Sequence, residues 1–387
     1  MHIHRYATRL SRPAAIIACS IGLAVSLSGC AGGRGGGGGG SGGGPSAKSG
    51  SGMTGRAFVP DSASIAILAD PVAVEALRAE ALQYLQEMTA DPYPGYRANA
   101  IEALADVPEV GEQVARTGLS DENPAVRYAS AMVIGRRLYA SSAPLVNALV
   151  RDVDPSVRLA SLYAMKRNGY RVDLTPLADA LRSSPDARVR ANAAYILGEL
   201  GDPTAITLLR DALTYDVPKS TVADIRIYQL QVAEALVKLG DHNSLSRLRA
   251  PLYTRDPADG EIAAFAAAIL GRVGDRSSIP DLVKIVAMWK EYRYSAEIRL
   301  AAMGSLAQLG QPPDPEMIAE YLGPEFQADE ANVWVRGVRS QATYVLGLIE
   351  SSEVVLPYLV GLYRTDGDDL VRIPAAAGLL NHLPASP

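Results

Sequence analysis

Apolar residues recur along most of this chain with the period of an amphipathic helix. From about residue 61 onward they fall at spacings of three and four residues, which places them on one face at 3.6 residues per turn. Segments of this kind alternate with shorter apolar helical stretches, such as PLVNALVRD, TPLADALRSS and VVLPYLVGLY. The pattern predicts an all-α body built from paired helices.

The longer helices repeat when they are aligned on an arginine-type position. Successive aligned positions are separated by 30 to 40 residues, and a period of this size is typical of a solenoid. Nine segments share the pattern, and they begin at or next to Arg97, Arg127, Arg158, Arg190, Leu230, Ile262, Arg299, Arg339 and Arg372.

Two columns of this alignment support the repeat. Three residues after the aligned position every segment has Ala, Ser or Val, which lets a neighbouring helix come close. Seven residues after it every segment has a large apolar residue: Leu104, Ile134, Met165, Leu197, Leu236, Leu270, Leu306, Leu346 and Leu379. A single helical hairpin cannot bury such a face alone, so we expect an α-solenoid of about nine stacked helical hairpins over residues 61–384.

The loops between the paired helices carry a second signature. Aspartates stand six residues before four of the arginines, at Asp91, Asp121, Asp152 and Asp366, and Gly-Asp pairs close three helices at Gly201, Gly240 and Gly274. An aspartate before a helix can cap its free N–H groups, and glycine suits the residue just past a helix end.

This pattern resembles the HEAT repeat, in particular the short form named after phycobilisome lyases. The resemblance covers about 320 residues, and the chain departs from it at Ala263, where the arginine is missing, and before Arg339, where no aspartate precedes. It implies a ladder of Asp and Arg side chains between adjacent repeats.

The N-terminus predicts export. Residues 1–12 are basic, residues 13–27 are apolar but short for a membrane span, and LSGC at residues 27–30 resembles the lipobox of bacterial lipoproteins. That resemblance implies a signal peptide over residues 1–29 and a lipid on Cys30, anchoring the protein to the cell envelope in either membrane leaflet. An ordinary cleaved signal peptide and an uncleaved anchor are the alternatives.

A Gly- and Ser-rich segment follows at residues 30–60, and we expect a disordered tether there. Its glycine run lacks the flanking strand and helix and the Lys-Ser or Lys-Thr of a phosphate loop. The stretch GELGD, which ends at Asp202, also reads as a repeated helix end rather than a phosphate site.

Charge and composition limit the kinds of partner and cofactor that we expect. The formal net charge is −5, and removing Arg5, Arg9 and Arg12 with the leader leaves 34 basic and 42 acidic residues, a net of −8. An acidic body argues against nucleic acid. Both cysteines, Cys19 and Cys30, precede the body, and only two histidines follow the leader, so we expect no disulfide, no metal centre and no cofactor.

Two surfaces are candidates for binding a protein partner. The first is the concave face, where the positions two, five and nine residues after the aligned one point away from the buried face. Tyr and Arg anchor many interfaces, and on this face they gather with one Asn at Arg136, Tyr163, Arg167, Asn192 and Tyr195. A solvated helix face with ordinary tyrosines is the alternative.

The second surface is a loop edge in the later repeats. Its long loops carry Trp289, Tyr292, Tyr294, Phe326 and Trp334, which could bind a protein or stack on a cell-wall carbohydrate such as peptidoglycan. The alternative is that these aromatic residues only pin the loops to the array. On the last helix, Leu379, Leu380 and Leu383 have no capping repeat after them and suggest a dimer contact.

Catalysis has little support in the sequence. Deoxyhypusine hydroxylase shares the HEAT scaffold but binds two irons through His-Glu pairs, and this chain contains no His-Glu dipeptide. Phycobilin lyases act inside photosynthetic cells, and HEAT-like DNA glycosylases need a basic groove. We therefore expect a lipid-anchored envelope scaffold for a protein partner, with a glycan binder as the alternative and a HEAT-repeat enzyme of the lyase or hydroxylase kind as a further one.

Overall fold

The computed structural model describes residues 56–254, 256, 259–292, 294–328 and 331–384. The predicted signal peptide, most of the tether and Cys30 lie outside these residues. Within them every regular element is a helix, so the prediction of an all-α solenoid is confirmed. In this part of the chain no helix has both the length and the apolar character needed to cross a membrane.

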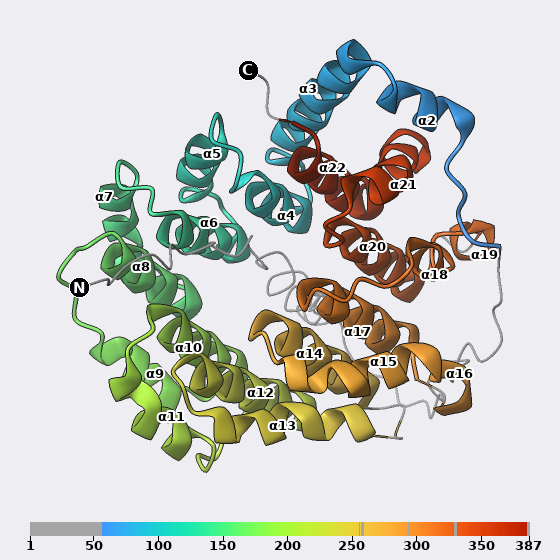
Figure 1. Cartoon of the computed structure of the whole chain (residues 1–387). Helices are drawn as coiled ribbons and strands as arrows, with labels where there is room; N and C mark the ends of the chain where they lie inside the picture. The colour runs from blue at the N-terminus through green and yellow to red at the C-terminus, as the bar shows by residue number, and fades with distance from the viewer. Residues whose placement is uncertain (1–55, 255, 257–258, 293, 329–330, 385–387) are drawn as a thin grey trace, which may run out of the picture.

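The second helix of each hairpin carries the aligned repeat. These helices are α4 (Pro94–Leu104), α6 (Pro124–Arg137), α8 (Pro155–Arg167), α10 (Ala187–Leu200), α12 (Val222–Lys238), α14 (Gly260–Arg272), α17 (Ala296–Gln308), α20 (Val333–Gly347) and α22 (Asp369–His382). All of them lie on the inside of the array in Figure 1.

The first helices form the outer layer and are shorter in the middle of the chain, where 3-10 turns extend several of them. After a leading helix α2 (Ser62–Leu68) they are α3 (Pro71–Met88), α5 (Gly111–Gly118), α7 (Ala143–Val146) with η1 (Asn147–Arg151), α9 (Thr175–Ser183) and η2 (Pro203–Ala205) with α11 (Ile206–Ala212). The later ones are η3 (His242–Ser244) with α13 (Leu245–Arg249) and η4 (Ala250–Tyr253), η6 (Arg276–Ser278) with α15 (Ile279–Ala287) and α16 (Trp289–Tyr292), α18 (Pro315–Ala319) with α19 (Pro324–Gln327), and α21 (Ser352–Thr365).

The two predicted columns are where the helices meet. Every residue of the small column is buried, and so is every residue of the large column except Met165, which is half-buried. The amphipathic pattern therefore located the core correctly.

The glycines end the helices as predicted, whereas the helix starts are capped by residues other than the predicted aspartates. Gly201, Gly240 and Gly274 have φ values of 73°, 100° and 71°, as a left-handed helix end requires. The aspartates predicted to cap helices organise the preceding loop instead: Asp121 accepts from the backbone N–H of Asn123 at 2.8 Å.

The caps are the residues directly before the prolines that open α6 and α8. Asn123 accepts from Ala125 N–H at 2.9 Å, and Asp154 accepts from Ser156 N–H at 2.8 Å. The prediction was wrong by two residues, because the loop turns once more before each helix begins.

The implied Arg–Asp ladder is present at the start of the array. Arg97 pairs with Asp121 at 2.7 Å and Arg127 pairs with Asp152 at 2.8 Å, each reaching into the next repeat. Arg158 binds the backbone oxygen of Asp152 at 2.6 Å instead of a carboxylate of the following repeat.

The ladder continues from a different position in the middle repeats. Arg210, at the end of α11, pairs with Asp241 at 3.0 Å, and Arg249, at the end of α13, pairs with Asp275 at 2.7 Å. Asp241 and Asp275, from two of the three Gly-Asp pairs, thus join neighbouring outer helices.

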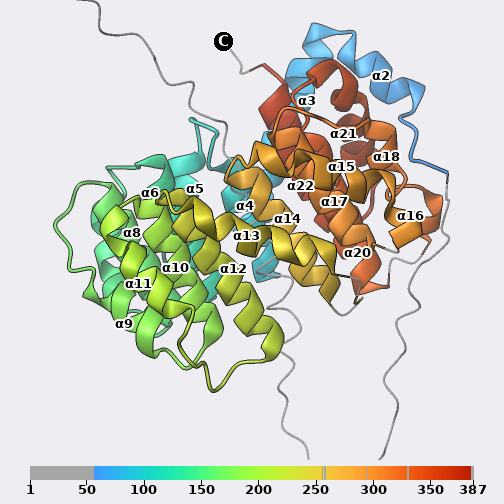
Figure 2. The ribbon, with the colours of Figure 1, turned by 60° about the horizontal axis from the view of Figure 1, so that its bottom comes forward.

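The array closes into a ring, which the sequence did not predict. Figures 1 and 2 show α2 and α3, in blue, beside α21 and α22, in red. α22 packs against α3 and α4 as well as against its own neighbours α20 and α21. One hydrophobic cluster accordingly joins Leu77, Leu85 and Leu104 of the first hairpin to residues of the helices from α12 to α22.

Polar and aromatic contacts complete the seam, the contact between the first hairpin and the last helices of the array. The Tyr84 hydroxyl donates to Asp369 at 2.7 Å, and its ring lies edge-on to Tyr363 with 5.6 Å between centroids. The Arg372 guanidinium stacks 4.3 Å from the Tyr84 ring centre. Arg336 donates to the Tyr96 hydroxyl at 3.0 Å.

The closure corrects the prediction for the last helix. Leu379, Leu380 and Leu383 are buried in the hydrophobic cluster that also contains residues of the first hairpin, and α22 packs against α3 and α4. They therefore do not form an exposed dimer contact. The first hairpin thus packs against the last helix of the array.

Candidate inner-face pocket

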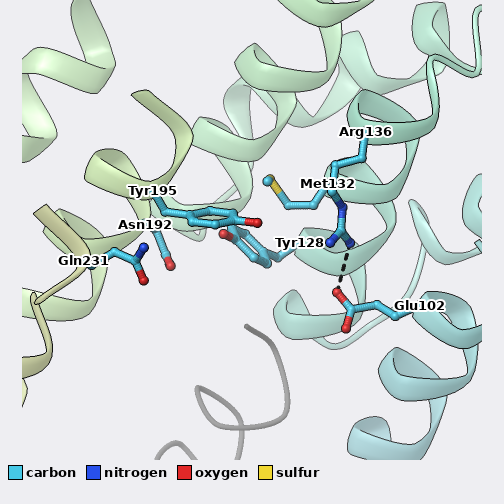
Figure 3. A pocket seen from close by; sticks show the side chains of 7 residues that line it. All are labelled: Glu102, Tyr128, Met132, Arg136, Asn192, Tyr195 and Gln231. Atoms are coloured by element: carbon cyan, nitrogen blue, oxygen red, sulfur yellow. Dashed lines mark hydrogen bonds and ion pairs between the residues drawn. The ribbon is translucent and has the colours of Figure 1, made fainter. Parts of the chain in front are cut away.

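The inner helices surround a pocket of about 50 Å³, seen in Figure 3. Its lining comes from four helices, α4, α6, α10 and α12, and the residues are Glu102, Tyr128, Met132, Arg136, Asn192, Tyr195 and Gln231. α8 lies between α6 and α10 and contributes none of them.

Two tyrosines dominate the pocket. Tyr128 and Tyr195 come from α6 and α10 and point toward one another in Figure 3, with Met132 beside them. Burial raises the pKa of Tyr195 to about 12, so its phenol stays protonated at neutral pH and can donate a hydrogen bond.

Two amides complete one side of it. The Asn192 side chain donates to the Ser156 hydroxyl at 2.9 Å, and the Gln231 side chain donates to Glu234 at 2.7 Å. Each amide is fixed through its nitrogen, which leaves its carbonyl oxygen to accept from a ligand.

The opposite side carries the two charged residues of the lining. Arg136 pairs with Glu102 at 3.2 Å, the dashed contact in Figure 3, and their side chains are 14% and 2% exposed. The pocket is therefore neutral overall.

A buried ion network lies next to the pocket and holds Tyr195. Glu234 is fully buried and pairs with Arg272 and with Lys238, both at 2.9 Å. Burial alone would raise the pKa of Glu234, but the charges and hydrogen bonds of Arg272 and Lys238 lower it well below its ordinary range. Lys238 also pairs with Glu199 at 2.6 Å and lies 4.9 Å from the centre of the Tyr195 ring. These contacts fix the tyrosine against α12.

The structure brings together three of the five predicted concave residues, namely Arg136, Asn192 and Tyr195. Arg167 is exposed at the end of α8 and does not line the pocket. Tyr163 is 1% exposed, so the expectation that it faces outward beside Tyr195 is wrong. Its ring packs against Gly135 of α6, where a Cβ atom would lie only 2.5 Å from it.

Sequence reasoning missed Tyr128. It lies one residue after the aligned Arg127, and only positions two, five and nine were taken as inward-facing. Tyr128 is four residues before Met132, and side chains with this spacing share a helix face. Including the i, i+4 neighbours of the predicted positions would have found it.

The predicted loop-edge residues are distributed over several environments. Phe326 is 5% exposed and lies edge-on to Tyr321 at 5.6 Å, so it pins its loop to the core. Tyr294 donates to the backbone oxygen of Leu252 at 3.4 Å and stacks on Tyr292 at 6.0 Å.

The two tryptophans of this edge contact different sides of α17. The Arg299 guanidinium lies 4.7 Å from the Trp289 ring centre, whereas the Trp334 indole N–H donates to Glu297. Residues two apart on a helix point in nearly opposite directions. Trp289 and Trp334 therefore do not form one flat platform, although Trp334 itself is 43% exposed.

The described residues contain no group of three or more His, Cys, Asp or Glu side chains placed to hold a metal ion. His242 opens η3. His382 lies at the end of α22, with its ring nitrogens 2.9 Å from the Ser352 hydroxyl and 3.1 Å from the Gly347 backbone oxygen.

Comparison with known proteins identifies the repeats. Residues 113–194, 142–227 and 174–263 match HEAT repeats, a region that contains α6, α8, α10 and α12. Over this region the chain is therefore similar to HEAT repeats, in agreement with its array of paired helices. No curated protein sequence matches it.

Two solved structures show limited similarity. Human deoxyhypusine hydroxylase in complex with glycerol is 16% identical over 73% of this chain and 99% of its own, with a TM-score of 0.35. An engineered protein is 18% identical over 81% of this chain and 87% of its own, with a TM-score of 0.26.

Proposed function

We propose that this HEAT-type scaffold is lipid-anchored in the bacterial cell envelope and holds a protein partner on the inner face of its ring. The observation that carries the proposal is the pocket itself. Four helices that are far apart in the sequence present two tyrosines, two amides and a paired arginine to one point. Tyr and Arg anchors in a concave surface are typical of protein recognition.

The point where residues 56–60 meet the body fits this arrangement. These residues join the body at the outer rim: Phe58 N–H donates to the Ala319 oxygen of α18 at 3.0 Å, and the Phe58 ring packs against Gly361 of α21. A lipid on Cys30 would therefore hold the ring by its edge, on residues distinct from those that line the pocket.

The anchor is tested by labelling cells with an alkyne-tagged palmitate analogue. Cys30→Ser should abolish labelling and release the protein from membranes, because the lipobox cysteine carries the acyl chain. Cys19→Ser is the matched control and should be labelled normally. Equal labelling of both variants would overturn the anchor.

Partner binding is tested by crosslinking in native membranes. A Tyr195→Ala/Asn192→Ala double variant should lose the partner that the wild type captures, while Tyr170→Ala, an exposed tyrosine outside the pocket, should retain it. Retention by a correctly folded double variant would exclude this face.

A second candidate, glycan binding at the loop edge, is favoured by Trp334. An exposed indole beside the Glu297 carboxylate offers a stacking face and a hydrogen-bond acceptor, which together suit a sugar. Titration with soluble peptidoglycan fragments should change tryptophan fluorescence in the wild type and not in Trp334→Phe. Absence of any change in the wild type would contradict it.

A further inference from the structure

The charges that line the pocket on the inner face balance each other. Its single cation and its single anion, Arg136 and Glu102, form a pair with each other, and the remaining lining residues are uncharged. An ionic ligand would have to leave water without gaining a counter-charge, which is costly. A neutral ligand meets no such penalty.

The hydrogen-bonding groups of the pocket match those of a peptide backbone. The Asn192 and Gln231 carbonyl oxygens can accept from backbone N–H groups, since both amide nitrogens are engaged within the protein. The protonated Tyr195 hydroxyl can donate to a backbone carbonyl oxygen. An extended chain exposes both kinds of group, whereas a helix uses them internally.

The size and the walls of the pocket select a small, flat side chain. Its volume of about 50 Å³ corresponds to roughly three to five water molecules, on the scale of 10–15 Å³ for each. Proline is compact and packs against aromatic rings, and aromatic-lined grooves bind proline-rich segments in the polyproline II conformation.

The spacing of the inner helices favours the same ligand. One turn of polyproline II rises about 9 Å over three residues, and packed helices lie roughly 8–10 Å apart. Every third residue of such a segment would therefore meet the next inner helix. The conformation is largely formed before binding, so less entropy is lost on docking.

We infer that the pocket between Tyr128 and Tyr195 binds an extended, uncharged segment of the protein partner and seats one of its prolines. This inference rests on the proposed function for the identity of the ligand as part of a partner. Peptide binding itself can be measured without that partner.

The test is calorimetric titration of the full chain, purified in detergent, with blocked hexapeptides. The probes are three Ala-Pro repeats, three Ala-Gly repeats and three Glu-Pro repeats, together with tri-N-acetylchitotriose. We expect the Ala-Pro peptide to bind at least tenfold more tightly than each of the others. No binding of it, or equal or tighter binding of any other probe, would overturn the inference.

Variants assign the binding to the pocket. Tyr195→Ala and Asn192→Ala should each weaken Ala-Pro binding at least tenfold, and the Tyr170→Ala control should leave it unchanged. Tyr195→Phe keeps the ring and the packing against Lys238, so it tests the hydroxyl even where Tyr195→Ala fails to fold; it should weaken binding about threefold to tenfold. Unchanged binding in both Tyr195→Phe and Asn192→Ala would place the peptide elsewhere and contradict the inference.

The two proposals can fail separately. The Tyr195→Ala/Asn192→Ala variant could lose the crosslinked partner although the wild type does not bind the Ala-Pro peptide. That result would contradict the proline inference and support the scaffold function. Pocket-dependent peptide binding with partner capture unaffected by the double variant would sustain the inference about the ligand's chemistry and contradict the proposed function.

Discussion

Gly135 decides which tyrosines line the inner pocket. The absence of a side chain on this residue of α6 lets the Tyr163 ring from α8 come close to the helix backbone. Tyr163 is thereby removed from the inner face, while Tyr128 and Tyr195 on the flanking helices remain there. A single glycine thus shapes the pocket without touching a ligand.

The sequence identified only part of this site. Helical periodicity was enough to predict that Arg136, Asn192 and Tyr195 face inward, because that direction depends only on the helix to which each residue belongs. The direction of the Tyr163 ring depends on Gly135 of the neighbouring helix, a contact across repeats that periodicity does not contain.

A substitution at Gly135 tests this packing. Gly135→Ala should lower the free energy of unfolding by about 1–3 kcal/mol, because a Cβ atom there meets the Tyr163 ring and the α8 backbone. Gly337→Ala is the matched control: it is exposed in α20 with no atom within 4 Å of the added carbon, and it should stabilise by about 0.5–1 kcal/mol. Urea unfolding of both variants measures the difference, and two changes of the same sign would contradict the account.

Individual elements were predicted better than the contacts between them. Periodicity and the small column gave the second helices, and the Gly-Asp pairs gave three of their ends. The arginine that pairs with each ladder aspartate was harder to predict from the sequence. Asp152 binds Arg127 of the previous repeat through its carboxylate and Arg158 of its own repeat through its backbone oxygen. Which arginine takes the carboxylate depends on how the two loops stack, and this is tertiary information.

The ladder makes stability depend on pH. Burial alone would raise the pKa of Asp152, but hydrogen bonds from Arg127 and from the Asp154 N–H, with the Arg127 charge, lower it below its ordinary value near 3.8. A carboxylate whose pKa is lowered by folding stabilises the fold fully above its unfolded pKa, and the contribution is lost as the pH falls through the folded pKa.

Asp152→Asn tests this linkage. At pH 7 it should lower the free energy of unfolding by about 1–3 kcal/mol, because the Arg127 guanidinium loses its counter-charge. The deficit should begin to shrink below about pH 4, where this carboxylate becomes protonated in the unfolded chain, and it should be lost as the pH falls through the lowered pKa of the folded protein. Urea unfolding between pH 3 and pH 7 measures it, with Asp179→Asn, an exposed aspartate on α9, as control. A deficit that does not change with pH would refute the electrostatic account.

At the scale of the whole molecule, the ring is the feature that the sequence did not reveal. Each hairpin contacts mainly its neighbours, so a small rotation per repeat accumulates over the array and decides whether its ends meet. No local sequence pattern predicts this accumulated rotation. The three C-terminal leucines, which suggested an open end, are buried, and the last helix packs against α3 and α4.

The seam should behave as a real interface between the first and last repeats. Tyr84→Ala should destabilise it by about 3–5 kcal/mol, because a buried ring and its hydrogen bond to Asp369 are removed. Hydrogen exchange should then accelerate in α22 as well as in α3, while α10 on the far side stays protected. Tyr84→Phe removes only the hydroxyl and should show a smaller effect in the same helices. Unaltered exchange in α22 of the Tyr84→Ala variant would mean that the last helix does not depend on the first hairpin.

The claim that the inside of the ring is the working surface is tested most directly by site-specific photocrosslinking in native membranes. The photoreactive residue p-benzoylphenylalanine replaces Tyr195 in the pocket or Tyr170 outside it, in otherwise unchanged full-length protein. We expect a discrete protein adduct from the Tyr195 position, competed by the Ala-Pro peptide, and none from the Tyr170 position. An adduct from the Tyr170 position with none from Tyr195 would contradict the claim.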